Sequence, residues 1–372
     1  MRALHVASGR LFGGIEQMLV TVARERSVTP DVAVTFAVAA PGRLEDELRG
    51  SDADVQALGD VRLSRPVSVV KARSLLRGVL GRVRPDAVVC HAPWSYALFA
   101  PVARRMRLPL VCWQHDRAAG RSFVERWAAR TPADLVICNS AWTSRTAAAL
   151  QPQAPVTVIH PPVTVPPCPT GTRADLRRDL GAGPADVVLL SASRLEPWKG
   201  HFNLVRALGR LRTTGAWTLW IAGAAQRPHE HQYLADVRRE VARLGLEPRV
   251  RFLGERRDVP FLMRAVDLFC QPNEGPEPFG VVFAEALLSG VPVVTVDAGG
   301  APEIVSEACG RLVPAGDLDA LGRVLGELIE NAGLRARLGA CGPAHASARC
   351  APDVVLPQIA RALGQLGRRH TA

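Results

Sequence analysis

Short apolar runs alternate along the chain with longer amphipathic stretches. Patterns typical of helices, such as those at 15–25 and 69–83, lie between runs that are short enough to be strands. In the first half of the chain the predicted strands lie at 2–7, 32–38, 54–57, 87–90, 108–113, 135–138 and 157–159. Strands that alternate with helices in this way predict βαβ units around a parallel sheet.

A proline-rich stretch at 160–169 interrupts this series and has the composition of a linker. The chain is therefore expected to form two doubly wound, Rossmann-like α/β domains, 1–165 and 166–351, which face each other across a cleft. Ligands of such sheets bind beyond the carboxyl ends of the strands, so motifs that directly follow a strand are the candidates for a site. The predicted strands of the second half lie at 187–191, 217–222, 250–253, 267–270, 291–296 and 310–313.

The stretch 273–294 is the most informative part of the chain, because a loop rich in Gly, Pro and acid precedes a helix and a short strand. Glu277 lies just before the predicted helix, and Glu285 lies well inside it. Gly280 and Val281 would place free backbone N–H groups at the start of this helix, where the dipole favours an anion such as a diphosphate. Two carboxylates beside such a turn suit a ligand with hydroxyls at one end and phosphates in its middle, which describes a nucleotide-sugar.

A second motif, Ser193-Arg194-Leu195-Glu196-Pro197-Trp198-Lys199-Gly200, directly follows the predicted strand at 187–191. Arg194 can bind a diphosphate through a bidentate fork, and Lys199 can do so as a point charge. Both cations would also stabilise the charge on a departing nucleoside diphosphate. An ordinary surface turn is the alternative interpretation.

Taken together, these motifs resemble the retaining glycosyltransferases of family 4, which have the GT-B fold. Glu277 and Glu285 match the E-x7-E element of that family. The matching motifs occur in the order of the family and span most of the chain, at 13–16, 194–200, 277–285 and 299–304.

The resemblance implies a role for each matching residue. Glu285 would accept hydrogen bonds from the ribose hydroxyls of the donor, and Glu277 would contact the hydroxyls of its sugar. His115 resembles a histidine whose backbone or ring lies beside the reacting sugar, although a lone histidine near a strand end is more often structural. The segment 352–372 would be a last helix that crosses back onto the first domain. The expected catalytic residues are His115, Glu277, Arg194 and Lys199, and the expected donor-binding residues are Gly13, Gly14, Arg194, Lys199, Glu277, Phe279, Gly280, Val281 and Glu285.

Charge is distributed unevenly along the chain, which has a net charge of +11. Residues 62–130 hold fourteen Arg or Lys and three Asp or Glu. Such a face favours anionic partners and predicts peripheral contact with an anionic membrane, although an arginine-rich solvated surface gives the same pattern. Aromatic and basic residues are not interleaved in the manner of nucleic-acid-binding proteins, so no nucleic acid is expected as a partner.

The eight cysteines include no C-x-x-C pair. Cys90, Cys112 and Cys138 each end an apolar run, which indicates buried, reduced thiols in a cytoplasmic protein. No apolar run is long enough to span a membrane, and the first residues show no signal-peptide core. The expected location is therefore the cytoplasm, with a peripheral contact at the inner face of the membrane as an open alternative.

No metal site is expected. Asp52-Ala53-Asp54 has the Asp-x-Asp spacing of metal-dependent sugar transferases, but it lies in a polar stretch far along the chain from the other motifs. Arg194, Lys199 and the predicted helix N-terminus at Gly280 can supply the compensating charge instead.

The function best supported by these patterns is transfer of a hexose from a UDP-sugar or GDP-sugar to a hydroxyl of a glycan, lipid-linked or small-molecule acceptor. The resemblance implies retention of the anomeric configuration. No carboxylate nucleophile is evident, so we expect same-side displacement in which the leaving phosphate takes the acceptor proton. A glycoside phosphorylase, a nucleotide-sugar epimerase and a non-catalytic sugar-nucleotide-binding protein remain alternatives. No cofactor besides the donor is expected, and no G-x-G-x-x-G follows the first predicted strand, which argues against an NAD enzyme.

Overall fold

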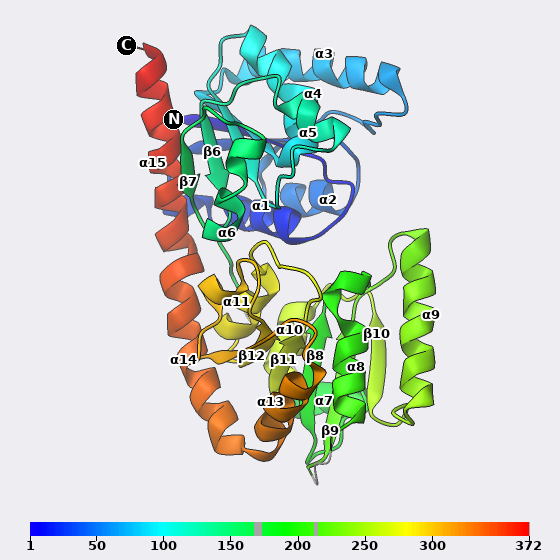
Figure 1. Cartoon of the computed structure of the whole chain (residues 1–372). Coiled ribbons are helices and arrows are strands. Elements are labelled where there is room, and N and C mark those ends of the chain that lie inside the picture. Colours follow the sequence, from blue (N-terminus) through cyan, green and yellow to red (C-terminus); the bar gives the residue numbers. More distant parts are fainter. Residues whose placement is uncertain (167–172, 212–214, 372) are drawn as a thin grey trace. The chain divides into compact units, whose positions relative to one another are not determined.

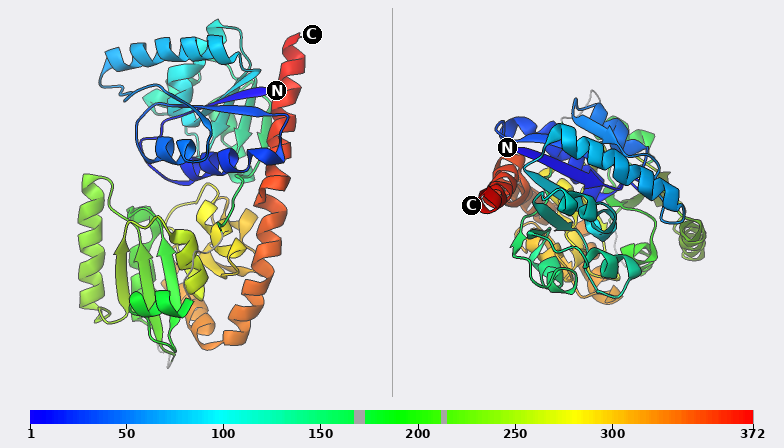
Figure 2. Two further views of the ribbon diagram at one scale, coloured as in Figure 1. Left: turned by 180° about the vertical axis from the view of Figure 1, so that it is seen from behind. Right: turned by 90° about the horizontal axis from the view of Figure 1, so that it is seen from above.

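The computed structural model describes residues 1–166, 173–211 and 215–371, with side chains as far as residue 366. The chain divides into two compact units, Met1–Val163 together with Arg349–Ala372, and Thr164–Ala348. Each unit has a parallel sheet with helices on its faces (Figures 1 and 2). This architecture confirms the prediction of two doubly wound α/β domains. Residues 167–169 of the predicted linker lie outside the described part of the chain.

The first unit holds a seven-stranded sheet in the order β3-β2-β1-β4-β5-β6-β7. All neighbouring strands run parallel. The order reverses between β1 and β4, which is where a doubly wound sheet offers a binding crevice at its carboxyl edge. The strands are β1 (Arg2–Ala7), β2 (Ala33–Val38), β3 (Asp54–Ala57), β4 (Ala87–His91), β5 (Leu110–Gln114), β6 (Leu135–Cys138) and β7 (Val156–Val158).

Side chains of these strands enter two separate cores, because successive strand residues point to opposite faces of a sheet. Leu4 and Val6 pack with α3 and α4 on one face, whereas Ala3 and Ala7 pack with α1, α2 and α15 on the other. Since both faces are covered, the strands appear in the sequence as continuous apolar runs. The helices of this unit are α1 (Gly14–Arg24), η1 (Arg26–Val28), α2 (Arg43–Arg49), α3 (Pro66–Val83), α4 (Ala92–Arg105), α5 (Phe123–Ala128), α6 (Ala141–Ser144), η2 (Ala147–Ala149) and α15 (Pro352–Thr371).

Helix α15 belongs to the first unit although it comes last in the chain. Val355, Ile359, Leu363 and Leu366 recur at helical spacing and are buried in the same core as α1. The helix also contacts η1 and β4. The C-terminal segment therefore completes the core of the unit that the N-terminal segment begins.

The second unit holds a six-stranded parallel sheet in the order β10-β9-β8-β11-β12-β13. Its order reverses between β8 and β11, so the loops that leave these two strands lie at the expected binding edge. The strands are β8 (Val187–Ala192), β9 (Trp217–Ala222), β10 (Val250–Gly254), β11 (Leu268–Gln271), β12 (Val293–Val296) and β13 (Gly310–Val313).

One face of this second sheet packs against α8, α9 and α13. Helices α7, α10 and α11 form a second group, in which α10 contacts both of the others and also β8. Of the remaining helices, η3 and α12 are short, and α14 directly precedes α15 in the chain. The helices are α7 (Arg173–Asp179), η3 (Pro197–Lys199), α8 (His201–Gly209), α9 (Pro228–Arg243), α10 (Val259–Ala265), α11 (Val281–Leu288), α12 (Ala301–Ile304), α13 (Leu318–Glu330) and α14 (Ala332–Cys350).

Candidate functional site

The loops that leave β8 and β11 are joined by their backbones at the point where the strand order of the second sheet reverses. The amide of Glu274 donates a hydrogen bond to the carbonyl of Trp198 over 2.8 Å. Gly200 has a φ of +76°, and a Cβ at this position would lie 1.8 Å from the carbonyl oxygen of Pro272. Only glycine allows so close an approach, so Gly200 brings the Arg194–Gly200 motif against the Glu277 loop.

Lys199 and Glu277 form a direct ion pair between these two loops. Lys199 Nζ lies 2.7 Å from Glu277 Oε2, and each side chain is only 12% exposed. The ammonium group also lies 3.8 Å from the centroid of the Trp198 ring, within the range of a cation–π contact. Because the pair is largely shielded from water, its attraction is screened less than that of a surface ion pair.

The two carboxylate oxygens of Glu277 have different surroundings. Oε2 accepts hydrogen bonds from Lys199 Nζ and from Asn273 Nδ2, the latter over 2.8 Å, and Gln271 Nε2 lies 3.4 Å away. Asn273 and Gln271 are fully buried. In the described part of the chain, no side chain donates to Oε1. Glu277 is therefore held by one oxygen and can accept hydrogen bonds with the other.

Gly299 and Gly300 fix the backbone of Glu277. Gly300 N donates to the carbonyl of Glu277 over 2.7 Å, and Glu277 and Gly299 form an isolated parallel bridge. Gly299 has a φ of +74°, and a Cβ there would lie 2.1 Å from the Glu277 carbonyl oxygen. The Gly299-Gly300 turn after β12 therefore supports the loop that carries the carboxylate.

Glu285 lies on α11 and is 8% exposed. Its carboxyl group makes no hydrogen bond or ion pair with any residue that the structure describes; only its backbone carbonyl accepts from Ser289. Burial raises the pKa of this carboxyl group from 4.5 to about 7, because the charged form loses its hydration. A buried acid of this kind gains most from a ligand that brings hydrogen-bond donors.

The N-terminus of α11 lies between the two glutamates in the sequence. Gly280 caps the helix with a φ of +93°, and a Cβ there would lie 2.3 Å from the ring of Phe283. The first N–H groups of a helix, here beginning at Val281, have no partner within the helix and attract anions. Phe279, expected as a donor-binding residue, is 1% exposed, so its ring belongs to the core.

Arg194 is paired with an acid that the sequence analysis did not select. Arg194 Nη1 lies 3.0 Å from Glu196 Oε1, and Arg227 Nη1 lies 3.6 Å from the same oxygen. Trp198 Nε1 donates to the other oxygen of Glu196 over 3.0 Å. Arg194 is therefore positioned by Glu196, two residues further along the same loop, and Arg227 from the loop after β9 approaches the same carboxylate.

Gly13 and Gly14 lie at the start of α1, directly after the loop that follows β1. Gly13 N donates to Glu16 Oε2 over 3.0 Å, so the Glu16 carboxylate satisfies one of the free amides of the helix N-terminus. In this structure, Glu16 therefore acts as part of the helix cap.

His115 follows β5 and is one of three buried histidines in a row. His115 Nε2 lies 2.9 Å from His91 Nδ1, and His91 Nε2 lies 2.9 Å from His5 Nδ1. Burial lowers the pKa of His5 to about 4 and that of His115 to about 3. Burial and the neighbouring imidazoles also lower the pKa of His91 well below its ordinary value. At neutral pH all three rings are neutral.

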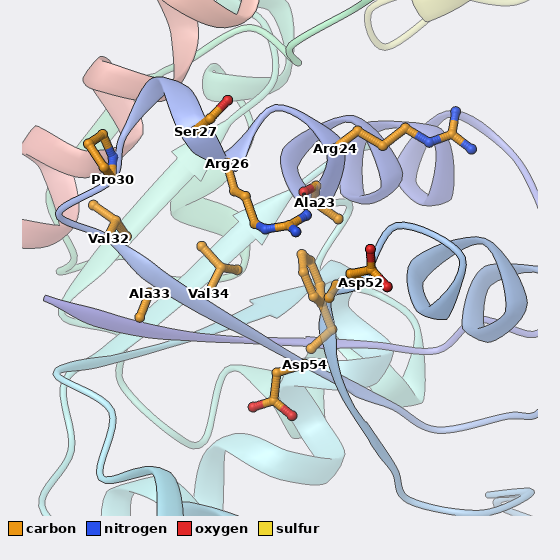
Figure 3. Close-up of a pocket in the computed structure, with 12 residues that line it drawn as sticks. Ala23, Arg24, Arg26, Ser27, Pro30, Val32, Ala33, Val34, Asp52 and Asp54 are labelled. Carbon is orange, nitrogen blue, oxygen red and sulfur yellow. Dashed lines mark hydrogen bonds between the residues drawn. The ribbon is translucent and has the colours of Figure 1, made fainter.

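A hollow of about 540 Å³ lies in the first unit, at the edge where β2 and β3 begin (Figure 3). None of the expected site residues lines it. Asp52 and Asp54 do line it, and Asp54 is occupied by hydrogen bonds from Thr35 and Gln56. Within the described ranges, no cluster of His, Cys, Asp or Glu has the arrangement of a metal site.

Two family models match the chain, Glycosyltransferase Family 4 at residues 12–165 and Glycosyl transferases group 1 at residues 172–344. The GDP-mannose-dependent alpha-(1-6)-phosphatidylinositol monomannoside mannosyltransferase of Mycolicibacterium smegmatis (strain ATCC 700084 / mc(2)155) is 32% identical over 289 residues, which cover 72% of this chain and 74% of that protein. The chain belongs to the group 1 glycosyltransferases. The prediction that the chain is a glycosyltransferase is thereby confirmed.

A second curated relative and a solved structure are also similar to this group 1 glycosyltransferase. The lipopolysaccharide core biosynthesis mannosyltransferase LpsB of Rhizobium meliloti (strain 1021) is 33% identical over 235 residues, or 62% of this chain. The match spans 64% of LpsB, slightly less than two thirds of its length. The crystal structure of Anabaena Alr3699/HepE in complex with UDP and glucose has a TM-score of 0.85 at 28% identity, covering 98% of this chain and 100% of that one. The predicted GT-B fold is confirmed.

None of the helices in the described ranges combines the length and the hydropathy that crossing a bilayer requires.

Proposed function

We propose that this group 1 glycosyltransferase moves a hexose from a nucleoside-diphosphate sugar to an acceptor hydroxyl and retains the anomeric configuration. The observation that carries the proposal is the largely buried carboxyl group of Glu285, to which no described residue donates a hydrogen bond. Buried polar groups are nearly always hydrogen-bonded in folded proteins. The neighbouring hydroxyls of a ribose are donors that would satisfy both oxygens of this carboxylate.

Groups that attract anions, at the start of α11 and in the loop after β8, support a diphosphate as the middle of the ligand. The N-terminus of α11 offers backbone amides at Val281, and Lys199 supplies an ammonium group that is already held in place. Arg194, positioned by Glu196, would supply a second cation. These groups would take the compensating role that a divalent metal ion has in other sugar transferases.

Glu277 supports a sugar at the far end of the ligand. Its Oε2 atom is occupied by Lys199 and Asn273, so Oε1 would accept hydrogen bonds from the hydroxyls of the hexose. The same ion pair links the sugar-binding acid to the phosphate-binding cation. Correct binding of the sugar would therefore favour correct binding of the diphosphate, and the reverse.

The chemical step would be a same-side displacement. The bond between the anomeric carbon and the phosphate oxygen breaks, and a bond between the anomeric carbon and the acceptor oxygen forms on the same face. The acceptor hydroxyl gives its proton to the departing phosphate oxygen. Lys199 and the α11 N-terminus would stabilise the negative charge that develops on the diphosphate.

The similar proteins narrow the choice of donor and acceptor. HepE was solved with UDP and glucose and with UDP-glucose, and the mycobacterial relative is named as GDP-mannose-dependent. We therefore propose a UDP-hexose or GDP-hexose as donor. Both LpsB and the mycobacterial relative are named for glycolipid synthesis, which supports a lipid-linked or glycan acceptor.

Helix α3 supports a peripheral contact between the first unit and an anionic membrane. Val67 is 80% exposed and Val70 is 68% exposed, so two apolar side chains face solvent on one helix. Arg65 and Lys71 flank them in the sequence. Apolar residues beside cations are typical of helices that lie on anionic lipid.

The configuration of the released sugar tests the proposal. Incubation with UDP-glucose or GDP-mannose should release free hexose slowly in the absence of acceptor, and proton NMR would identify its first anomer. The α-anomer should appear first, because both donors are α-linked. First appearance of the β-anomer would contradict retention, and a protein that neither binds nor cleaves any donor would contradict the proposed function.

A further inference from the structure

The row His5–His91–His115 crosses the three strands at the centre of the first sheet. His5 lies on β1, His91 ends β4, and His115 follows β5. The rings are stacked, with centroids 5.1 Å apart for His5 and His91 and 5.2 Å apart for His91 and His115. Trp113 stacks on both His91 and His115. All three histidines are buried, with exposures of 1%, 2% and 8% along the row.

The middle ring constrains the two outer rings. A neutral imidazole has one N–H donor and one acceptor nitrogen, and His91 uses both nitrogens within the row. If His91 donates through Nε2, then His5 must accept at Nδ1 and His115 must donate through Nε2. If His91 donates through Nδ1, each of these roles is reversed. In either arrangement, all three rings carry their proton on the same type of nitrogen.

Burial and geometry keep the row in one protonation state at neutral pH. Protonation of any ring would place a charge in a buried site, which is why the pKa of each histidine lies far below its ordinary value. The Nε2–H form is the intrinsically preferred tautomer of a neutral histidine. In that form His91 donates to His5, His115 donates to His91, and Nδ1 of His115 remains an acceptor.

The orientation of His115 is fixed from both ends of the residue. Its backbone carbonyl accepts a hydrogen bond from Asn139 Nδ2 over 3.0 Å, and its ring is held at Nε2 by His91. In the described part of the chain, the other ring nitrogen of His115, Nδ1, has no hydrogen-bond partner. This atom lies just beyond β5, at the carboxyl edge of the sheet.

We propose that His5 and His91 are positioning residues for His115, which they hold as a neutral imidazole whose Nδ1 atom accepts a hydrogen bond from a sugar hydroxyl. The assignment of the hydroxyl to a sugar rests on the proposed function, whereas the state of the row does not. His5 and His91 act only through His115 and would not touch the substrate.

Histidine NMR tests the state of the row directly. Long-range proton–nitrogen spectra of the full chain, labelled with 15N in its nine histidines, report the tautomer of each ring. His5, His91 and His115 should all show a protonated Nε2 and an unprotonated Nδ1 at pH 7. A cationic His115, or a protonated Nδ1 on His115, would overturn the proposal. This measurement needs no substrate and no substitution.

Substitution of His91 tests the positioning role. His91→Leu should give His115 a mixture of tautomers and lower kcat/KM about tenfold. A tenfold loss corresponds to the upper range of the free energy that one hydrogen bond contributes. His91→Gln, which can both donate and accept, should restore most of the activity. Cys90→Ala is the matched control, because Cys90 is equally buried on the same strand but faces the other core. An unchanged His115 spectrum in His91→Leu would overturn the positioning role.

The two proposals fail in distinguishable ways. A row with the expected spectrum in a protein that uses no nucleotide-sugar would contradict the proposed function and leave the state of the row intact. Normal transfer in His91→Leu, with the same KM and kcat as the parent, would contradict the positioning role and leave the proposed function intact.

Discussion

Lys199 Nζ lies 2.7 Å from Glu277 Oε2, and this contact joins two motifs that are 78 residues apart in the chain. The lysine follows β8 and the glutamate follows β11, the two strands between which the sheet order reverses. The ion pair is thus the point at which the proposed phosphate-binding and sugar-binding residues become one site.

Replacement of Lys199 tests the ion pair. Lys199→Ala should lower kcat/KM by about 100-fold or more, because it removes a cation from the departing diphosphate and releases Glu277. The loss should appear in steady-state donor hydrolysis with the fold intact by circular dichroism. Lys71→Ala is the control, since Lys71 is the other lysine of the chain and lies on α3 of the first unit. Equal activity of the two variants would rule out this role for Lys199.

The pH dependence of stability tests the environment of Glu285. Its folded-state pKa is raised from 4.5 to about 7, so the folded protein is not penalised below pH 4.5 and is increasingly destabilised as the pH rises towards 7. Glu285→Gln removes this penalty, which amounts to about 3 kcal/mol at most for a shift of this size. The melting temperature of Glu285→Gln should therefore exceed that of the parent at pH 8 and match it near pH 4.5. A difference that does not depend on pH would contradict the assignment.

A pair of glycine substitutions tests the support of the Glu277 loop. Gly299 and Gly316 have similar φ angles of +74° and +78°, but a Cβ would clash with Glu277 only at Gly299 and would meet nothing within 4 Å at Gly316. Each alanine variant should lose about 1–2 kcal/mol of stability to the left-handed conformation. Gly299→Ala should lose more, and should also lose donor turnover. Similar activity in the two variants would show that the Gly299 turn does not support the site.

Membrane contact can be tested with the exposed valines of α3. The parent should co-sediment with vesicles rich in phosphatidylglycerol at low salt and be released at high salt. Val67→Ser/Val70→Ser should weaken this binding several-fold by removing the apolar contact. Val156→Ser/Val158→Ser is the control, because these valines are also exposed but belong to β7. A parent that stays in the supernatant at low salt would contradict membrane contact.

Much of the fold could be predicted from periodicity because both sheets are buried on two faces, which makes each strand a continuous apolar run. Some helix and strand boundaries differ by a few residues from the predicted ones. Helix α3 begins at Pro66, three residues before the predicted helix, because the fixed φ of proline suits a first turn. Helix α15 carries an apolar stripe, but a stripe does not identify the core that it covers.

The candidate site was less predictable than the fold. Lys199 and Glu277 were each selected from the sequence, but their ion pair depends on the order of β8 and β11 in the sheet. Phe279 lies within a motif, yet its ring is buried in the core. The row of histidines depends on strand neighbours and on register, since His5 pairs with Val89 and thereby lies near His91. No spacing in the sequence expresses such a relationship.

Calorimetric titration of the parent and of Glu285→Gln with UDP-glucose and GDP-mannose in the presence of EDTA tests the central claim most directly. The parent should bind one of these donors without a metal ion. Glu285→Gln should bind it at least about tenfold more weakly, because hydrogen bonds to a charged group contribute roughly 1.5–3 kcal/mol. Equal affinity in the two proteins, or binding by the parent only after magnesium or manganese is restored, would contradict the account.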